Sequence, residues 1–278
     1  MSATQNGRAP TALSGDRSAY RLMRILLPIM VAASGTAAWE AVVRYYEVPP
    51  YVLPAPSAIF ATLFSDWDVL SQSLLTTLLT TLEGFVAAAI GGIALALIFN
   101  LSKLVEASLF PYAVILQVTP VIAIAPLLLI YTPNTQTALL IVAFLVAFFP
   151  ILSNMVQGLK SVDHNLLNLF DLYGAGRWQQ LVFLKIPASM PYFMTGLRIG
   201  GGLSLIAAVV AEFAAGSAGA GSGLAFRLLE SGYRLDMPRL YAALILLTAT
   251  GVAIFGVTSF ISWLVLHRWH ESAVRREN

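Results

Sequence analysis

The chain has 278 residues, of which 58% are hydrophobic and 11% are charged, and its mean hydropathy is +0.78. A soluble domain usually carries roughly a quarter charged residues, so the composition excludes a soluble protein and indicates a membrane protein. The formal net charge of +2 argues against nucleic-acid binding, and the absence of cysteine excludes disulfides, thiolate metal sites and thiol catalysis.

The first 20 residues are polar, and we expect them to be a disordered segment ahead of a membrane domain at 21–270 and a tail at 271–278. A helix needs about 20 apolar residues to cross a bilayer. Such windows lie at 25–45, 74–99, 107–131, 137–159, 187–215 and 240–266. The predicted fold class is therefore an all-α membrane protein with about six transmembrane helices and both ends on the same side.

The distribution of basic residues predicts the orientation, because loops rich in Lys and Arg stay in the cytoplasm. One side has Arg44, Arg227, Arg234 and Arg239. The other side has Arg8, Arg17, Arg21, Arg24, Lys103, Lys160, Arg177, Lys185, Arg268, Arg275 and Arg276. Both termini and the loop at 160–186 are therefore predicted to be cytoplasmic. The proline-rich segment 48–56 and the short amphipathic stretch after it are predicted to lie on the outer surface.

The 160–186 loop is the longest predicted cytoplasmic connection. Residues 165–173 and 177–184 each have an apolar and a polar face at helical spacing, and Gly174 and Gly176 between them permit a sharp bend. The pattern predicts a short helix, a turn and a second short helix on the membrane surface. From the pattern alone, a simple connector that covers the helix ends fits as well as a docking element.

Four ionisable residues fall inside predicted spans, where each needs a partner or water. They are Glu40, Glu83, Arg198 and Glu212. Glu40 and Glu212 lie near the outer ends of their helices, and reaching outward to water explains them most simply. For Arg198 and Glu83 we hypothesise an ion pair between two spans.

The third predicted span contains Pro111, Pro120 and Pro126. A proline in a span frees a backbone carbonyl, which is acceptable only against protein or water. Thr119, Pro120 and Pro126 are therefore candidates for lining a solute pathway, and a kink needed for packing is an equal alternative. The small residues of 196–202 permit close helix packing, either at a dimer axis or beside a pathway.

Two other sequence features suggest functional sites, but for each we favour an interpretation without a site. The glycine-rich segment 216–223 is not followed by Gly-Lys-Ser/Thr, so we interpret it as a connector and not as a phosphate loop. His267 and His270 are three residues apart near the end of the chain, and we expect a solvated pair and no metal site. We find no catalytic constellation and expect no enzyme activity, cofactor or metal in this chain.

Several separated motifs resemble the permease subunits of ABC importers. The family's cytoplasmic loop has Glu-Ala-Ala, three intervening residues, a glycine, nine intervening residues and then Ile-x-Leu-Pro. Here Gly174 occupies the glycine position and residues 184–187 (Leu-Lys-Ile-Pro) close the motif, whereas residues 168–170 (Asn-Leu-Phe) depart from Glu-Ala-Ala. Residues 48–57, 119–126, 196–198, 211–212 and 268–272 are similar to the sulfonate, nitrate and pyrimidine branch of that family.

The resemblance implies the type I importer permease fold in a bacterial inner membrane. It implies a dimer, most simply of two copies of this chain, with two ABC ATPase subunits that hold ATP and Mg, and an extracytoplasmic substrate-binding protein. The loop would be the coupling helix that docks on the ATPase. The residues it assigns to that contact are Asn168, Asp171, Tyr173, Gly174, Ala175, Arg177, Trp178 and Pro187.

The resemblance favours import of a pyrimidine-type or other nitrogen heterocycle by alternating access, with sulfonate, taurine or nitrate as the runner-up. Two other classes compete with it. A secondary transporter would use Glu83 or Glu212 as an ion relay and would need no ATPase. An intramembrane enzyme is disfavoured, because no nucleophile and base are paired in the sequence.

Overall fold

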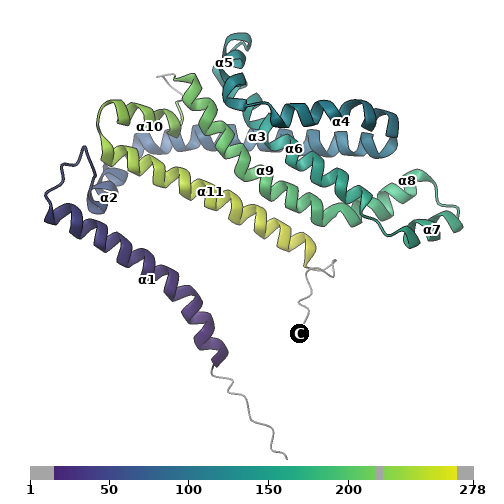
Figure 1. The fold of residues 1–278 in the computed structure, drawn as a ribbon, viewed down its shortest axis with the longest axis horizontal. Coiled ribbons are helices and arrows are strands. Elements are labelled where there is room, and N and C mark those ends of the chain that lie inside the picture. Colours follow the sequence, from purple (N-terminus) through teal and green to yellow (C-terminus); the bar gives the residue numbers. More distant parts are fainter. Residues whose placement is uncertain (1–15, 217–221, 268–278) are drawn as a thin grey trace, which may run out of the picture.

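The computed structural model describes residues 16–216 and 222–267, and throughout these ranges the regular structure is helical, with no strand (Figure 1). Five helices are long and apolar enough to cross a membrane. The helices, in chain order, are α1 (Asp16–Tyr45), α2 (Pro56–Ser65), α3 (Trp67–Leu101), α4 (Lys103–Val118), α5 (Val121–Tyr131), α6 (Thr135–Lys160), α7 (His164–Leu172), α8 (Arg177–Gln180), the π-helical turn η1 (Leu181–Lys185), α9 (Ile186–Ala215), α10 (Leu224–Tyr233) and α11 (Met237–Leu266).

The centre of the fold is the packing of α3, α6 and α9 against one another. Small residues permit this close approach: a Cβ atom placed on Gly84 of α3 would lie 2.5 Å from Ala143 Cβ of α6. On α9, a Cβ atom on Gly200 would lie 2.9 Å from Ile151 Cδ1 of α6. Gly196 and Gly200 of the small-residue stripe at 196–202 therefore pack against α6, whereas Gly201 approaches Ile254 of α11.

The predicted spans match α1, α3, α6, α9 and α11, and the predicted span at 107–131 corresponds to a bent pair of helices, not to one straight helix. The chain forms two helices there, α4 and α5, and their axes differ by 106°. Thr119 and Pro120 between them are extended, with ψ angles of 128° and 110°. Proline lacks an N–H and disfavours helical geometry in the residue before it. The total is six crossings if the bent pair crosses once.

The first helix lies apart from the rest of the molecule (Figure 1). Its C-terminal end lies near α2, and most of its apolar side chains are exposed in the single protomer. The helix begins at Asp16, so residues 16–20, which the sequence predicts to be disordered, are helical. Residues 1–15 and the predicted tail at 271–278 lie outside the described residues.

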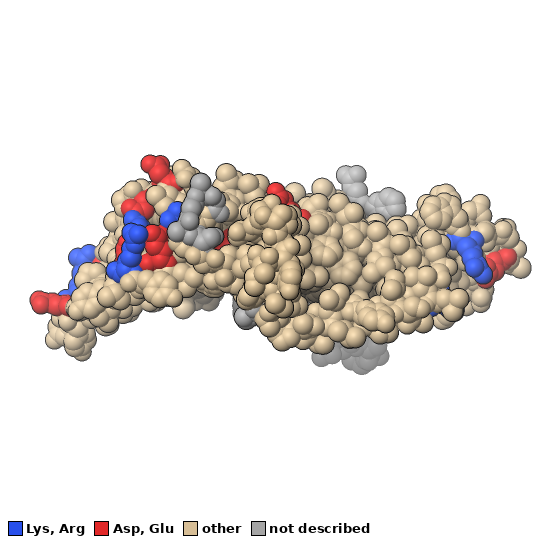
Figure 2. Space-filling model, turned by 90° about the horizontal axis from the view of Figure 1, so that it is seen from above, with Lys and Arg blue, Asp and Glu red and all other residues tan. Residues whose placement is uncertain are grey.

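Charged side chains gather toward the two ends of the elongated molecule, and most of its middle is uncharged (Figure 2). At one end, near α2 and α10, Arg239 pairs with Asp66 at 2.5 Å and Arg227 pairs with Glu230 at 2.8 Å. At the other end lie α7 and α8 (Figure 1). An apolar band between two charged ends is the pattern expected of a protein that crosses a bilayer.

Candidate coupling loop and intramembrane residues

The 160–186 loop contains the short helix and the bend that the sequence predicts. Gly174 follows α7 with φ of +70°, a conformation that side chains with a Cβ atom rarely adopt. No atom lies within 4 Å of the position that a Cβ atom would take there. The glycine is therefore needed for the backbone conformation and not for space.

Side-chain hydrogen bonds brace the bend from within. The Gln180 side chain donates from Nε2 to Asp171 Oδ1 at 2.6 Å and also to the carbonyl oxygen of Ala175 at 3.2 Å. Gly176 N–H donates to Gln179 Oε1 at 2.8 Å. Asp171 thus supports the shape of the loop, and the sequence reasoning missed its partner Gln180.

The outer face of the bend carries large exposed side chains. Tyr173 is 82% exposed and Trp178 is 66% exposed, and Leu172 and Phe183 are also exposed. Asn168 and Arg177 are exposed as well. Apolar and aromatic side chains gathered on a protruding element are typical of a protein interaction site.

The loop is joined to the core without a break. Residues from Arg177 to Ala215 form one helical run of 39 residues, so the second short helix and the fifth span are continuous. Pro187 lies in the first turn of α9, where the sequence predicts the fifth span to begin, and the helical run extends from it back into the loop. The π-helical turn η1 precedes Pro187, whose missing N–H is tolerated there. Leu181 is buried against Phe99 of α3.

Two polar contacts join the ends of the loop to α3 and α4. Lys160 pairs with Glu106 of α4, and Lys185 Nζ donates to Asn100 Oδ1 of α3 at 3.1 Å. Both partners are more than 50 residues away in the sequence, so the sequence reasoning missed them.

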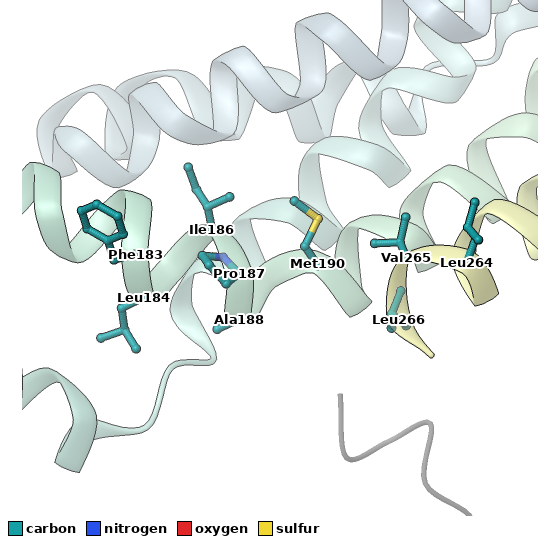
Figure 3. A pocket seen from close by; sticks show the side chains of 9 residues that line it. All are labelled: Phe183, Leu184, Ile186, Pro187, Ala188, Met190, Leu264, Val265 and Leu266. Carbon is teal, nitrogen blue, oxygen red and sulfur yellow. The ribbon is translucent and has the colours of Figure 1, made fainter. Parts of the chain in front are cut away.

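An apolar groove of about 650 Å³ lies where the loop enters α9 and where α11 ends (Figure 3). Its walls are aliphatic and aromatic side chains. They come from Phe183, Leu184, Ile186, Pro187, Ala188, Met190, Leu264, Val265 and Leu266. Pro187 therefore lines a surface groove.

Glu212, near the opposite end of α9, is buried, with 3% of its surface exposed. Its Oε1 accepts a hydrogen bond from Thr77 Oγ1 of α3 at 2.8 Å, and its Oε2 accepts one from Ala225 N–H of α10 at 3.0 Å. The expectation that Glu212 reaches outward to water is wrong, since protein donors bind both carboxylate oxygens.

Comparison with known proteins identifies the chain. Residues 88–276 match the family model described as the binding-protein-dependent transport system inner membrane component. The chain belongs to this family. It is thus an inner membrane component of a binding-protein-dependent transport system, and its relatives include an ABC transporter permease protein.

The permease is similar along most of its length to curated relatives. It is 29% identical to a probable ABC transporter permease protein of Haemophilus influenzae, over 89% of this chain and 98% of the relative. It is 34% identical to the riboflavin transport system permease protein RibX of Chloroflexus aurantiacus, over 84% and 86%. It is 30% identical to the formylaminopyrimidine transport permease protein ThiX of Halalkalibacterium halodurans, over 82% and 90%.

Permease proteins of bicarbonate, nitrate and taurine transport systems also match the permease, at 26%, 31% and 29% identity. The relatives therefore include proteins named for riboflavin and formylaminopyrimidine and proteins named for bicarbonate, nitrate and taurine.

The hypothesised ion pair between Glu83 and Arg198 of the permease is absent from the described residues. Glu83 is exposed, and the Arg198 guanidinium lies over the Phe255 ring of α11, 5.8 Å from its centroid. Arg198 Nε is buried without a hydrogen-bond partner in the described part of the chain. Arg198 faces α11, and the partner proposed on α3 is wrong.

The other intramembrane candidates are not among the hydrogen-bond partners of Glu212 in the described part of the chain. Thr119 donates from Oγ1 to the Ile115 carbonyl oxygen at 2.7 Å, which satisfies its hydroxyl within α4. Pro120 and Pro126 are exposed on the surface of the protomer. Glu40 accepts a hydrogen bond from Ser57 N–H at 3.0 Å and pairs with Arg44 at 2.6 Å.

The glycine-rich segment 216–223 and the pair His267 and His270 lie partly outside the described residues. Residues 217–221 of the glycine-rich segment and His270 are not among those that the structure describes. His267 Nδ1 lies 2.9 Å from the Leu264 carbonyl oxygen, at the end of α11. In the described ranges, no group of His, Asp and Glu could hold a metal ion.

Proposed function

We propose that the permease imports a small solute by alternating access, driven by a separate ABC ATPase that docks on the 160–186 loop. The observation that carries this proposal is the exposed aromatic pair Tyr173 and Trp178 on a braced bend. Asn168 and Arg177 would add polar contacts on the same exposed element. Side chains of Tyr and Trp commonly dominate binding energy at interfaces.

The continuity of the loop with α9 would make the docked element a lever. A helix transmits an axial displacement because its backbone hydrogen bonds resist bending, and rigid-body rotation is a common form of conformational change. Nucleotide-driven closure of the ATPase would displace Trp178 and, through the same helical run, the span that follows it. ATP and Mg would be held by the ATPase and not by the permease.

We also propose that the permease acts as a homodimer, with both termini in the cytoplasm of a bacterium and a substrate-binding protein on the outer side. The exposed apolar side chains of α1, α4 and α5 support a partner within the membrane. The basic side chains near the 160–186 loop support its cytoplasmic placement.

For the solute, we propose a pyrimidine-type or other nitrogen heterocycle. The relatives named for riboflavin and formylaminopyrimidine, at 34% and 30% identity, support this class. Away from the helix ends, Arg198 is the one basic residue in the described helices α3, α6, α9 and α11, so no basic cluster favours a small anion. A sulfonate, taurine or nitrate is the second candidate, supported by the relatives of that branch.

The docking proposal is tested by a Tyr173→Ala, Trp178→Ala double variant, co-expressed with the proposed partner ATPase. We expect ATPase recovery in a pull-down to fall at least about tenfold, because two exposed aromatic anchors are lost. The matched control is Tyr233→Ala, an 86% exposed aromatic at the opposite end of the molecule. Undiminished recovery of the ATPase would contradict the docking site. Uptake by the permease alone under an ion gradient would instead favour a secondary transporter.

A further inference from the structure

The first turn of α10 is bound by side chains from two other helices. Leu224 N–H donates to Thr77 Oγ1 of α3 at 2.9 Å, and Ala225 N–H donates to Glu212 Oε2 of α9 at 3.0 Å. The first N–H groups of a helix have no partner within the helix itself. Here they are satisfied by residues that lie 147 and 13 positions away in the sequence.

These contacts form a closed, buried unit, which we call the Glu212 cluster: Thr77, Glu212, Gly223, Leu224 and Ala225. Thr77, Leu224 and Ala225 are fully buried. A Cβ atom on Gly223 would lie 2.1 Å from Glu212 Oε1, so the carboxylate packs directly on the α10 backbone. Breaking a hydrogen bond in a buried site leaves a polar group without a partner, which is costly.

Two further hydrogen bonds join the same helices on either side of the Glu212 cluster. Arg227 Nε of α10 donates to Ser73 Oγ of α3 at 3.0 Å, one turn before Thr77. Ser204 Oγ of α9 donates to the Thr81 carbonyl oxygen of α3 at 2.9 Å, one turn after Thr77. The three helices α3, α9 and α10 are therefore connected at three successive levels.

The Glu212 cluster lies at the far end of the helical run that starts in the 160–186 loop. At 1.5 Å per residue, Arg177 and Glu212 are roughly 50 Å apart along the helix. We propose that Glu212 and Thr77 are positioning residues that make α10 move as one body with α9 and α3. A displacement of the loop would then reach α10 on the outer side. This inference rests on the proposed coupling function of the loop.

Glu212 is thereby assigned a role different from an ion relay or a pathway lining. Both of its carboxylate oxygens are occupied by donors that hold a helix in place. Its contribution is to bind α10, which carries Arg227 and Glu230 at the charged end of the molecule.

The cluster can be tested with a single reporter, because the chain contains no cysteine. Ala225→Cys places a thiol at a fully buried position of α10. The rate of its reaction with a membrane-impermeant maleimide is measured in the purified permease. We expect labelling to be at least about tenfold faster with Glu212→Leu, because both bonds of the carboxylate are lost. Glu212→Gln, which keeps an acceptor oxygen for Ala225 N–H, should label nearly as slowly as the parent.

Two further variants keep this test decisive. Thr77→Val conserves the side-chain shape and removes the hydroxyl, so it should accelerate labelling even if Glu212→Leu fails to fold. Glu83→Leu removes an exposed carboxylate of the same helix and should leave labelling slow. If the Ala225→Cys thiol still reacts slowly with the maleimide in both Thr77→Val and a folded Glu212→Leu variant, the proposed role of the Glu212 cluster is wrong.

The motion is tested in the permease assembled with its ATPase. If α10 moves with α9 and α3, Mg-ATP turnover should not change the labelling rate of Ala225→Cys in the parent. Faster labelling during turnover would mean that α10 separates from α9, and the proposal would be wrong. Failure of the ATPase to assemble would contradict the proposed function. Labelling of the isolated permease needs no ATPase, so it tests the role of the Glu212 contacts separately.

Discussion

Gln180 and Asp171 meet across the bend at Gly174, with Gln180 Nε2 2.6 Å from Asp171 Oδ1. Asp171 lies in the last turn of α7 and Gln180 is the last residue of α8, so this hydrogen bond sets the angle at which Tyr173 and Trp178 are presented.

Replacing Gln180 by Leu should weaken ATPase attachment without preventing membrane insertion. The variant roughly keeps the side-chain size and loses the bonds to Asp171 and to the Ala175 carbonyl oxygen. Each is worth about 1 kcal/mol, so the affinity for the ATPase should fall at least roughly fivefold. Titration of the ATPase against the permease in detergent measures this change. Gln136→Leu is the matched control, because Gln136 also donates from Nε2 to a side chain, Thr80 Oγ1 at 3.0 Å, in another part of the molecule. Equal losses in both variants would show a general packing effect.

Replacing Gly174 by Val should abolish transport and ATPase attachment and leave the subunit inserted. A φ of +70° costs a β-branched residue about 1–2 kcal/mol or more, so the bend would change shape. Gly174→Asn should be milder, since Asn tolerates this region better. Pull-down of the ATPase with the membrane fraction measures the effect.

Gly216 provides the control for backbone strain alone. It has φ of +53° at the other end of α9, and no atom lies within 4 Å of the position that a Cβ atom would take there. Gly216→Val should retain the ATPase. Loss of attachment in both variants would mean that strain anywhere along α9 disrupts the complex, and that the bend has no special role.

Gly200→Leu should destabilise the helix core, whereas Gly202→Leu should not. A Cβ atom at Gly200 would lie 2.9 Å from Ile151 Cδ1, while no atom lies within 4 Å of that position at Gly202. Overpacking of a close contact costs about 1–3 kcal/mol. Thermal unfolding of the two purified variants, two residues apart on one helix, gives a direct comparison. Equal melting temperatures would contradict the close packing of α9 on α6.

Glu230 should make the stability of the α10 region depend on pH. The hydrogen bond from Arg227, assisted by the charges of Arg227, Arg234 and Arg239, holds the pKa of Glu230 below its ordinary value of 4.5, against a smaller opposing effect of burial. A carboxyl whose pKa is lower in the folded state stabilises that state above its unfolded pKa. This contribution is lost as the pH falls through the folded pKa.

The melting temperature of the parent should therefore exceed that of Glu230→Gln at neutral pH. The difference should shrink below pH 4.5, as the Glu230 carboxyl becomes protonated. Thermal scans of both proteins across this pH range test the prediction. A difference that stays constant into the acid range would show that the Arg227 contact does not depend on the charge of Glu230.

The sequence alone determined which segments cross the membrane and where the loop bends. A spanning helix satisfies its own backbone hydrogen bonds, so its position follows from a local window of about 20 apolar residues. Gly174 could be identified for a similar reason, because its backbone conformation is a local property of the chain.

Only the tertiary structure decided which polar residues meet. Glu212 and Thr77 are 135 positions apart, and their bond depends on which faces of α3 and α9 pack together. The same packing turns Arg198 toward Phe255 and leaves Glu83 exposed. The 106° angle between α4 and α5 could not be predicted from the sequence either. Pro120 ends a helix locally, but the direction of the next helix is set by the surface of α6 and α9 on which it packs.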